Sequence, residues 1–343
     1  MLKKLSDCLR RHTFLCCVVL TGMLVLSVVA GISLGTAKIS FSTVWRIILH
    51  NLFGLFSIDD IKLSTLNIVW RIRIPRALLG MVVGGSLTLS GISMQAFTKN
   101  PLAEPYVLGI SSGASAGASL ALLTPIQFLA GQRQTTAFAF LGALLSALVV
   151  YSLAKKAGGG KLRPVTLLLS GTAVNAVMSA VTSFLIFRAK SPEGIAAVYS
   201  WQMGSISAAQ WKTLTIPAIF VVIGTVVFTL MGTRFNMMMM GDEDAAAMGL
   251  RVRLFRSCMF LVCSLVVASL VSITGIVGFV GLVVPHVTRL ISRTNDNRIV
   301  MPMSALLGAV FILWADAFAR CAFGAVELPI GIVTAFILSL IHI

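Results

Sequence analysis

Long apolar runs alternate with short polar segments along this chain of 343 residues. A helix needs roughly 20 mostly apolar residues to cross the hydrocarbon core of a bilayer, and each run approaches that length. The polar segments are too short to form a soluble domain. The pattern therefore predicts an all-α polytopic membrane protein of about ten transmembrane helices. The runs cover residues 14–35, 75–97, 105–124, 135–155, 164–187, 213–232, 255–274, 276–291, 301–320 and 328–343.

Composition supports one membrane domain over residues 1–343, because 57% of the residues are hydrophobic and only 11% are charged. The first run is too long to be a cleaved signal peptide. Two longer polar segments remain. Residues 41–56 are amphipathic and are expected to form a helix at the outer interface. Residues 193–204 are expected to form a short helix against the bundle.

The net charge of +16 is explained by topology rather than by nucleic acid, which we exclude as a partner. With the N-terminus in the cytoplasm, 16 of the 27 lysines and arginines lie inside and 11 outside, as the positive-inside rule requires. This topology, together with contacts to anionic membrane lipid, explains most of the positive charge. The inner set is Lys3, Lys4, Arg10, Arg11, Lys99, Lys155, Lys156, Lys161, Arg163, Arg234, Arg251, Arg253, Arg256, Arg289, Arg293 and Arg298.

Candidate catalytic or cofactor chemistry is sparse. Gly158-Gly-Gly-Lys161 resembles a phosphate-binding loop, but that motif needs Ser or Thr after the lysine and Leu162 stands there. The four histidines are scattered, and the six cysteines form no CxxC pair. We therefore expect no metal site, no cofactor, no disulfide framework and no nucleotide site.

Residues 236–250 predict a compact knob between two spans. Gly241 is expected to start a short helix whose first turn holds Asp242, Glu243 and Asp244, which favour the positive end of a helix, and Gly249 is placed to end it. A simple loop needs no apolar face outside the membrane, whereas an exposed apolar face usually marks a docking surface.

Several blocks together resemble the permease subunits of binding-protein-dependent ABC importers for iron–siderophores, haem and cobalamin, the FecCD/BtuC type. The resemblance covers residues 71–337. The blocks are Arg73-Ile-Pro-Arg76, Thr98-Lys-Asn-Pro-Leu-Ala-Glu-Pro105, Tyr106-Val-Leu-Gly-Ile-Ser-Ser-Gly-Ala-Ser-Ala-Gly117, Ser272 to Arg289, Asp296-Asn-Arg298, Ala315-Asp316 and Glu327-Leu-Pro-Ile-Gly331.

The resemblance implies a type II ABC importer permease fold in the bacterial cytoplasmic membrane. The implied partners are cytoplasmic ABC ATPase subunits, an extracytoplasmic substrate-binding protein, and a second permease copy or a close homologue. The chain itself would be no enzyme. The knob then corresponds to the coupling helix, about residues 241–250, which sits in a cleft of the ATPase subunit. The residues that we assign to this ATPase contact are Gly241, Asp242, Glu243, Ala246, Met248 and Gly249.

In the family, positions matching Arg73, Arg76 and Arg320 are outward arginines that receive glutamates of the binding protein. Ordinary snorkelling to the interface is the alternative explanation. Asp316 lies one helical turn before Arg320, so internal pairing is expected to use part of that charge.

The run 164–187 matches the helix that lines the central passage between two permease copies. Gly171 and Asn175 share one face of it and are candidate pathway residues, although an interhelical hydrogen bond explains Asn175 equally well. His286 and Arg289 share a helix face near the inner end, where we favour structural hydrogen bonding.

The chain departs from the family at two places. Asn297 stands where family members usually have histidine. After Ile337 the family continues Gly-x-Pro-x-Phe, whereas this chain ends Leu338-Ser-Leu-Ile-His-Ile343. One back-translation of these residues resembles a sequencing adapter, so we hypothesise that 338–343 are not native. Resequencing the locus tests this, since a genuine stop codon after Ile343 would refute it.

The function that this reading predicts is translocation of an iron–siderophore complex, with haem or cobalamin as alternatives. An ion-coupled secondary transporter would need acidic residues in mid-membrane, and Asp316 is the sole evident candidate. A membrane prenyltransferase would need paired acidic motifs, but Asp59-Asp60 stands alone. A receptor would have no use for the knob.

Overall fold

The computed structural model describes residues 2–35, 37, 39–126, 128–129, 131–322 and 327–341, and this part of the chain forms helices and loops without strands. The elements are α1 (Leu2–Ser33), α2 (Phe41–Phe53), α3 (Leu63–Asn67), η1 (Ile68–Arg73), α4 (Ile74–Thr98), η2 (Pro105–Leu108), α5 (Ile110–Leu123), α6 (Gln132–Ala157), α7 (Pro164–Arg188), α8 (Pro192–Gln202), α9 (Trp211–Leu230), α10 (Gly232–Met240), α11 (Asp242–Ala247), α12 (Val252–Thr274), α13 (Val280–Ser292), α14 (Asn297–Cys321) and α15 (Ile330–Ile341).

Every predicted apolar run contains a helix, which confirms the all-α fold class. Within the described chain, 7 helical stretches are long and apolar enough to cross a membrane. Three further helices are shorter than predicted: α5 has 14 residues, α13 has 13 and α15 has 12. Positive backbone φ angles shorten two of them. Gly109 (φ 75°) separates η2 from α5, while Gly275 (φ 68°) and Phe279 (φ 69°) precede α13.

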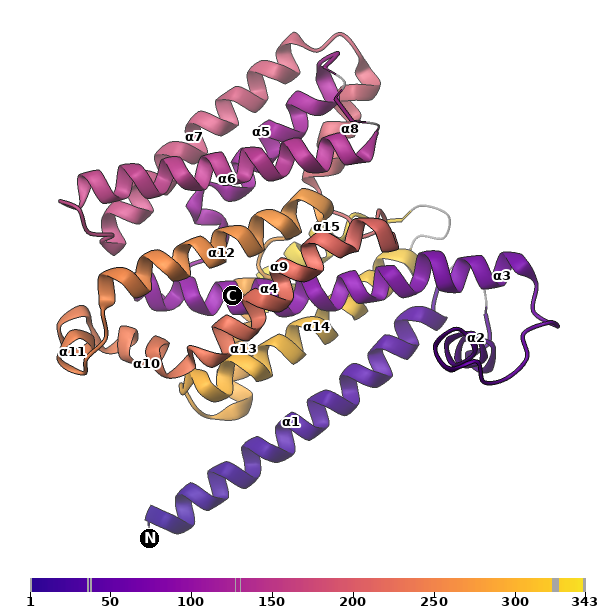
Figure 1. The fold of residues 1–343 in the computed structure, drawn as a ribbon, viewed down its shortest axis with the longest axis horizontal. Helices are drawn as coiled ribbons and strands as arrows, with labels where there is room; N and C mark the ends of the chain where they lie inside the picture. Colours follow the sequence, from indigo (N-terminus) through magenta and orange to yellow (C-terminus); the bar gives the residue numbers. More distant parts are fainter. Residues whose placement is uncertain are drawn as a thin grey trace.

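Helix α4 runs through the middle of the bundle, with α9, α12, α13 and α14 packed around it (Figure 1). In the most apolar window of the stretch Leu63–Thr98, 78% of the residues are buried, against 28% for α7. A membrane helix buried on all sides must pack through small side chains, because no water is present to drive association. The α4 sequence, rich in Gly and Ser, meets that requirement.

Two glycine pairs set the closest approaches to α4. A Cβ atom on Gly84 would lie 2.1 Å from the carbonyl oxygen of Gly308 in α14, and one on Gly91 would lie 1.8 Å from that of Gly281 in α13. Any side chain at these positions would push the helices apart. These glycines therefore serve close backbone contact between helices.

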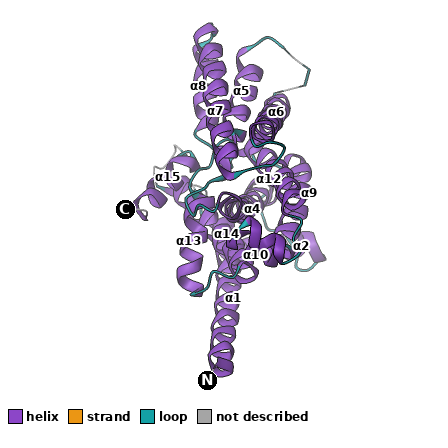
Figure 2. Ribbon diagram, turned by 90° about the vertical axis from the view of Figure 1, so that its left-hand side faces the viewer, coloured by secondary structure: helices purple, strands orange, loops and turns teal. Residues whose placement is uncertain are grey.

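Helices α5, α6, α7 and α8 form a second group on one side of α4, and α1 lies on the opposite side (Figure 2). Within this group α5 packs closely against α6, where a Cβ on Gly113 would lie 2.4 Å from the Gly142 carbonyl oxygen. Helix α7 lies at the margin, and Val177, Phe184 and Phe187 on it are exposed apolar side chains. This exposed helix is available to lipid or to another protein chain.

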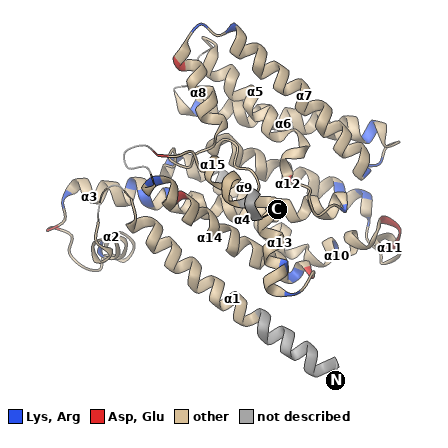
Figure 3. Ribbon diagram, turned by 180° about the vertical axis from the view of Figure 1, so that it is seen from behind, with Lys and Arg blue, Asp and Glu red and all other residues tan. Residues whose placement is uncertain are grey.

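Charged residues gather at the two ends of the bundle and leave its middle apolar (Figure 3). We call these ends the α11 end, which carries α10 and α11, and the α2 end, which carries α2 and α3. The N-terminus lies toward the α11 end (Figure 1). Two predicted polar-segment helices are confirmed: residues 41–56 contain α2, and residues 193–204 overlap α8.

The chain's last residues fall partly outside this description. Helix α15 extends to Ile341. Residues 342–343 and the side chains of 338–343 lie outside the described residues, so the hypothesis of a non-native tail stays a prediction.

Candidate functional site

A buried ionic cluster joins α4 to α14 at the α2 end. The guanidinium of Arg76 lies 2.9 Å from a carboxylate oxygen of Asp316 and 2.9 Å from one of Glu327. Arg320 lies 3.0 Å from the second oxygen of Asp316, one turn earlier on the same helix. The expected internal pairing of Asp316 with Arg320 is confirmed, and Arg76 shares the same carboxylate.

Arg73 belongs to the same cluster but is bound to backbone rather than to carboxylates. It donates to the carbonyl oxygens of Ile32 (2.9 Å) and Ser33 (2.8 Å) at the end of α1. Arg320 also donates to backbone carbonyl oxygens, those of Leu34 (2.9 Å) and Gly31 (2.8 Å). The two arginines therefore satisfy carbonyl groups that the helix end leaves without intrahelical partners. They tie α1 to η1 and α14.

The three predicted docking arginines are thus brought together, but they are only 5%, 6% and 6% exposed. Their guanidinium groups point at internal acceptors and not outward. The cluster holds the three arginines Arg73, Arg76 and Arg320 and the two acids Asp316 and Glu327, so one net positive charge remains. Glu327 is the half-exposed member, at 43% of its side chain. A carboxylate arriving from outside would have to compete with these two acids.

At the α11 end, α10 and α11 form the predicted knob. Gly241 has φ 140° and precedes α11, and Gly249 has φ 88° and follows it, so both positions favour glycine. Phe235 of α10 packs against Phe97 of α4 and Phe255 of α12, with ring centroids 5.9 and 5.2 Å apart. These aromatic contacts fix α10 to two spanning helices.

Asp242 anchors α11 to the bundle. Its two carboxylate oxygens accept hydrogen bonds from both terminal nitrogens of Arg256, at 2.7 and 3.0 Å, and Lys99 lies 3.7 Å away. Arg256 is buried and also donates to the carbonyl oxygen of Leu162. The hydrogen bond from Arg256 lowers the pKa of Asp242 below its usual value. The guanidinium of Arg256 on α12 therefore links α11 to the loop before α7.

The outward face of the knob is apolar. Ala245 is buried, whereas Ala246, Ala247 and Gly249 are exposed, and Met248 is 43% exposed. Met240, which ends α10, is also exposed. We call this set, residues 240 and 246–249, the knob face. Flexible Met side chains adapt to a partner groove, so the surface has the chemistry of a docking site.

Asn297, which the resemblance marked as a departure from the family pattern, supports the knob from α14. It is fully buried and its amide donates to the sulfur of Met239 at 3.3 Å, while its backbone N–H donates to Asn236. Asn236 also donates to Asp296 at 2.7 Å. Asn297 therefore belongs to the polar contact that joins α10 to α14.

A polar cleft of about 560 Å³ lies among α5, α7, α8 and the η2 turn. Asn175 lines this cleft and accepts a hydrogen bond from Ser112 of α5 at 2.6 Å. Asn175 therefore makes an interhelical hydrogen bond and also faces the cleft. Gln202 of α8 donates to Ser115 across the same cleft at 2.8 Å. The hydroxyl and amide side chains that line this cleft are Tyr106, Ser111, Ser112, Ser115, Asn175, Ser179, Thr182, Ser183, Tyr199 and Gln202.

Gly171 is not among the lining residues of this cleft. It is buried, and a Cβ there would lie 2.1 Å from the carbonyl oxygen of Val107. Its absent side chain lets α7 pack on η2. Of the two candidate pathway residues, Asn175 faces the cleft and Gly171 is a packing contact.

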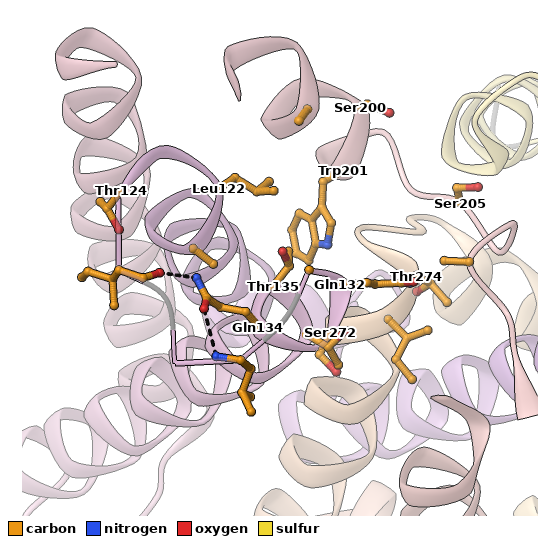
Figure 4. A pocket seen from close by; sticks show the side chains of 18 residues that line it. Leu122, Thr124, Gln132, Gln134, Thr135, Ser200, Trp201, Ser205, Ser272 and Thr274 are labelled. Atoms are coloured by element: carbon orange, nitrogen blue, oxygen red, sulfur yellow. Dashed lines mark hydrogen bonds between the residues drawn. The ribbon is translucent and has the colours of Figure 1, made fainter. Parts of the chain in front are cut away.

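A further cavity of about 880 Å³ lies on the other side of α8, at the α2 end (Figure 4). Trp201, Thr135 and Ser272 point into it from α8, α6 and α12. Gln134 closes its edge by accepting from the Leu129 N–H (3.2 Å) and donating to the Ile126 carbonyl oxygen (2.5 Å). Helix α8 thus separates two hydroxyl-lined spaces.

Comparison with known proteins decides the family. A sequence model of the FecCD transport family matches residues 23–343. The chain belongs to this family. It is 40% identical to the cobalamin import system permease protein BtuC of Halobacterium salinarum, over 79% of this chain and 70% of that protein. It is 32% identical to the hemin transport system permease protein HmuU of Yersinia pestis, over 92% and 90%.

Two further comparisons agree on fold and class. The Fe(3+)-citrate import system permease protein YfmD of Bacillus subtilis is 35% identical, over 89% of this chain and 86% of that protein. A solved structure of a metal-chelate type ABC transporter in an inward-facing conformation superposes with a TM-score of 0.81 at 25% identity, covering 95% and 96%. This FecCD-family chain is therefore an ABC importer permease of the cytoplasmic membrane, and in this family ATP hydrolysis is carried by a separate subunit.

Sequence reasoning missed a cross-link in the middle of this permease. Glu104 accepts a hydrogen bond from the backbone N–H of Phe279, and the Tyr106 hydroxyl donates to the Val277 carbonyl oxygen at 3.0 Å. These bonds join the turn after α4 to the broken backbone before α13. The signal was present in the sequence, since Glu104 is an acidic residue inside a proline-bracketed turn between two apolar runs.

The structural hydrogen bonding that we favoured for His286 and Arg289 is not recorded for either side chain in the described structure, and His286 is exposed on α13. Among the described residues, no group of three or more His, Cys, Asp or Glu side chains would hold a metal ion.

Proposed function

We propose that this FecCD-family permease carries an iron–siderophore complex across the cytoplasmic membrane. The cleft lined by Asn175 carries the proposal. Ten hydroxyl and amide side chains line it, and Glu104 at its edge accepts a hydrogen bond from the backbone N–H of Phe279. A hydrophilic metal chelate can exchange hydrogen bonds with such a surface. No opposite charge in the hydroxyl and amide lining would hold the chelate in place, and transit through a passage requires such weak binding.

The cleft is proposed as half of a passage between two permease copies, or between this chain and a close homologue. It opens beside α7, whose apolar side chains Val177, Phe184 and Phe187 are exposed in the single chain. A large exposed apolar surface beside a polar cleft suits an interface more than an isolated subunit. Asn175 is the side chain we assign to the passage.

The knob face is proposed as the contact with the ATPase subunit. This places the α11 end and the N-terminus in the cytoplasm, and the α2 end outside. The placement is supported by the excess of lysine and arginine at the α11 end. Asp242 and Arg256 would transmit movement of α11 to α12 and to the loop before α7.

The α2 end is proposed as the docking surface of the extracytoplasmic binding protein. Arg73, Arg76 and Arg320 remain the assigned residues, supported by the cluster's net positive charge. Since Asp316 and Glu327 already pair with Arg76, and Asp316 also pairs with Arg320, docking would act by exchange. An incoming carboxylate would replace half-exposed Glu327 beside Arg76.

Uptake in a strain that lacks its own permeases tests the cargo. The strain would express this chain with its ATPase and binding protein and would receive radiolabelled iron–siderophore, haem or cobalamin in parallel. Uptake of the iron chelate, abolished when the ATPase is omitted, is the expected result. Uptake by this chain alone without ATP would contradict the importer mechanism as a whole.

Cobalamin is the second candidate, because a 40% identical relative is a cobalamin import permease and an amide-rich cargo would also suit the hydroxyl and amide lining. Haem, the other alternative, is a mostly apolar ring and would prefer aromatic walls. Labelled cobalamin accumulating in place of iron would transfer the assignment to that cargo.

A further inference from the structure

A groove at the α2 end lies between α6, α9 and the end of α12, away from the polar cleft. It encloses about 500 Å³. Its walls are mainly apolar and include Ala137 and Phe140 of α6 and Ile273 of α12. The ring of Phe140 lies 6.2 Å from that of Phe220 in α9, about two helical turns below the start of either helix.

Two cations stand at the rim of this groove, Arg133 on α6 and Lys212 on α9. Both are exposed, and the described residues give neither of them an ion pair. None of the residues lining the groove is acidic. The groove therefore presents uncompensated positive charge above an apolar wall.

The groove continues into surfaces that face lipid. Below Arg133 and Ala137, α6 exposes Leu141, Leu145 and Leu148 at helical spacing. Below Lys212, α9 exposes an equivalent apolar stripe. Its members are Ile219, Val222, Ile223 and Val226. Since both helices are long and apolar enough to cross a membrane, these stripes meet acyl chains directly.

The depth of the rim matches a lipid headgroup. Trp211, beside Lys212, is 40% exposed. Its ring packs against that of Trp70 in a tilted arrangement, with centroids 5.7 Å apart, and its N–H donates to the Trp70 carbonyl oxygen at 2.8 Å. Tryptophans of this kind mark the interface between headgroups and hydrocarbon. Arg133 and Lys212 thus stand at the level of phosphate groups, and Phe140 stands in the hydrocarbon below.

We propose that this groove binds an anionic glycerophospholipid of the leaflet at the α2 end. The phosphate sits between Arg133 and Lys212, where a guanidinium fork and an ammonium both bind phosphate oxygens. One acyl chain lies along Ala137 toward Phe140. A soluble anion would contact the cationic rim but leave the apolar walls uncovered. A lipid contacts both the rim, through its phosphate, and the walls, through its acyl chain. The site is separate from the cargo cleft and does not depend on the cargo.

The test is lipid binding to the purified full chain in detergent, measured by native mass spectrometry during titration with phosphatidylglycerol. The double variant Arg133→Ser with Lys212→Ser should bind about thirtyfold more weakly, because each cation near a phosphate contributes roughly a factor of five or more. A second variant, Ala137→Trp, fills the groove and keeps both cations, and it should also weaken binding. Phosphatidylcholine, which has no net charge, should bind much less than phosphatidylglycerol.

The matched control is Arg188→Ser with Lys190→Ser, which removes two exposed cations outside the groove. This control should retain wild-type affinity. Equal loss in both double variants would show that only the overall charge attracts lipid and would overturn the site. Unchanged phosphatidylglycerol affinity in the groove double variant, or in Ala137→Trp with its fold intact by gel filtration, would overturn it as well.

Discussion

Arg76 shows how one residue's role depends on partners far away in the sequence. Its two carboxylate partners, Asp316 and Glu327, lie 240 and 251 residues later. Removing one member of a buried ion pair leaves its partner's charge uncompensated, which costs more than the pair contributes. We expect Arg76→Met to lower the free energy of unfolding by about 3 kcal/mol. Denaturation of the permease alone in detergent, without its binding protein, measures this.

Arg71 provides the control, because it is exposed on η1, five residues before Arg76. Arg71→Met should change stability by less than about 0.5 kcal/mol. If the two variants were equally stable and both weakened docking, the burial of Arg76 would have no structural role. Loss of stability in Arg76→Met alone would mean that docking assays of such variants must first be corrected for folding.

Asp242 makes a prediction about pH. The bond from Arg256 lowers the pKa of this carboxyl in the folded protein, so the pair's contribution is present above the unfolded pKa and is lost as the pH falls through the folded pKa. Thermal unfolding of wild type and Asp242→Asn should therefore differ above about pH 4 and converge below it. Because Asp242 is 44% exposed, the difference should be small, below about 1 kcal/mol. A difference that grew on acidification would contradict the pairing.

At the scale of elements, apolar run length located the spanning helices because the bilayer imposes one length on all of them. It misjudged the runs 105–124 and 276–291, because it ignores backbone conformation. Gly109 and Phe279 adopt positive φ and break these runs into shorter helices. The breaks are held by long-range bonds such as that between Tyr106 and Val277, which no local pattern reveals.

Gly171 tests the packing of α7 on η2. Alanine there would place its Cβ 2.1 Å from the Val107 carbonyl oxygen, so a spanning helix must shift. Gly171→Ala should destabilise the fold by about 1–3 kcal/mol. Gly22→Ala in α1 is the matched control, because nothing lies within 4 Å of a Cβ there. Differential scanning fluorimetry compares them, and equal melting temperatures would remove Gly171 from the packing contact.

Met248 tests the knob face. Met248→Asp puts a charge on an apolar surface while leaving Asp242 and Arg256 in place, so α11 should fold but bind the ATPase poorly. We expect about a tenfold to hundredfold weaker association, and ATP hydrolysis that no longer drives uptake. Binding-protein docking should be retained. Asp244→Asn, at an exposed polar position of the same helix that is not among the assigned ATPase-contact residues, serves as the control. Coupled transport at the wild-type rate in Met248→Asp would exclude this face as the docking site.

At the scale of the whole molecule, the sequence predicted the local structure of the knob, but it did not predict which arginine side chains are buried. The knob is local: two glycines, three acids and a methionine within nine residues define it. The arginine cluster is not local, because α1, η1, α14 and Glu327 must assemble before its donors find their acceptors. From sequence alone, isolated arginines at the end of a spanning helix are equally compatible with exposed side chains and with buried, paired ones.

The orientation of the molecule gives the last prediction. The N-terminus and α11 lie toward one end of the bundle, while α2 and α3 lie at the other (Figure 1). A cysteine at Glu243 should therefore react with a membrane-impermeant maleimide only in inverted vesicles, and a cysteine at Asp59 should react in intact cells. The background must lack Cys258 and Cys321, which are exposed. If Glu243→Cys reacted in intact cells, the knob would face outward and no cytoplasmic ATPase would reach it. The lipid groove would then move to the inner leaflet with its chemistry unchanged, so this experiment separates the orientation of the permease from the sites built into its fold.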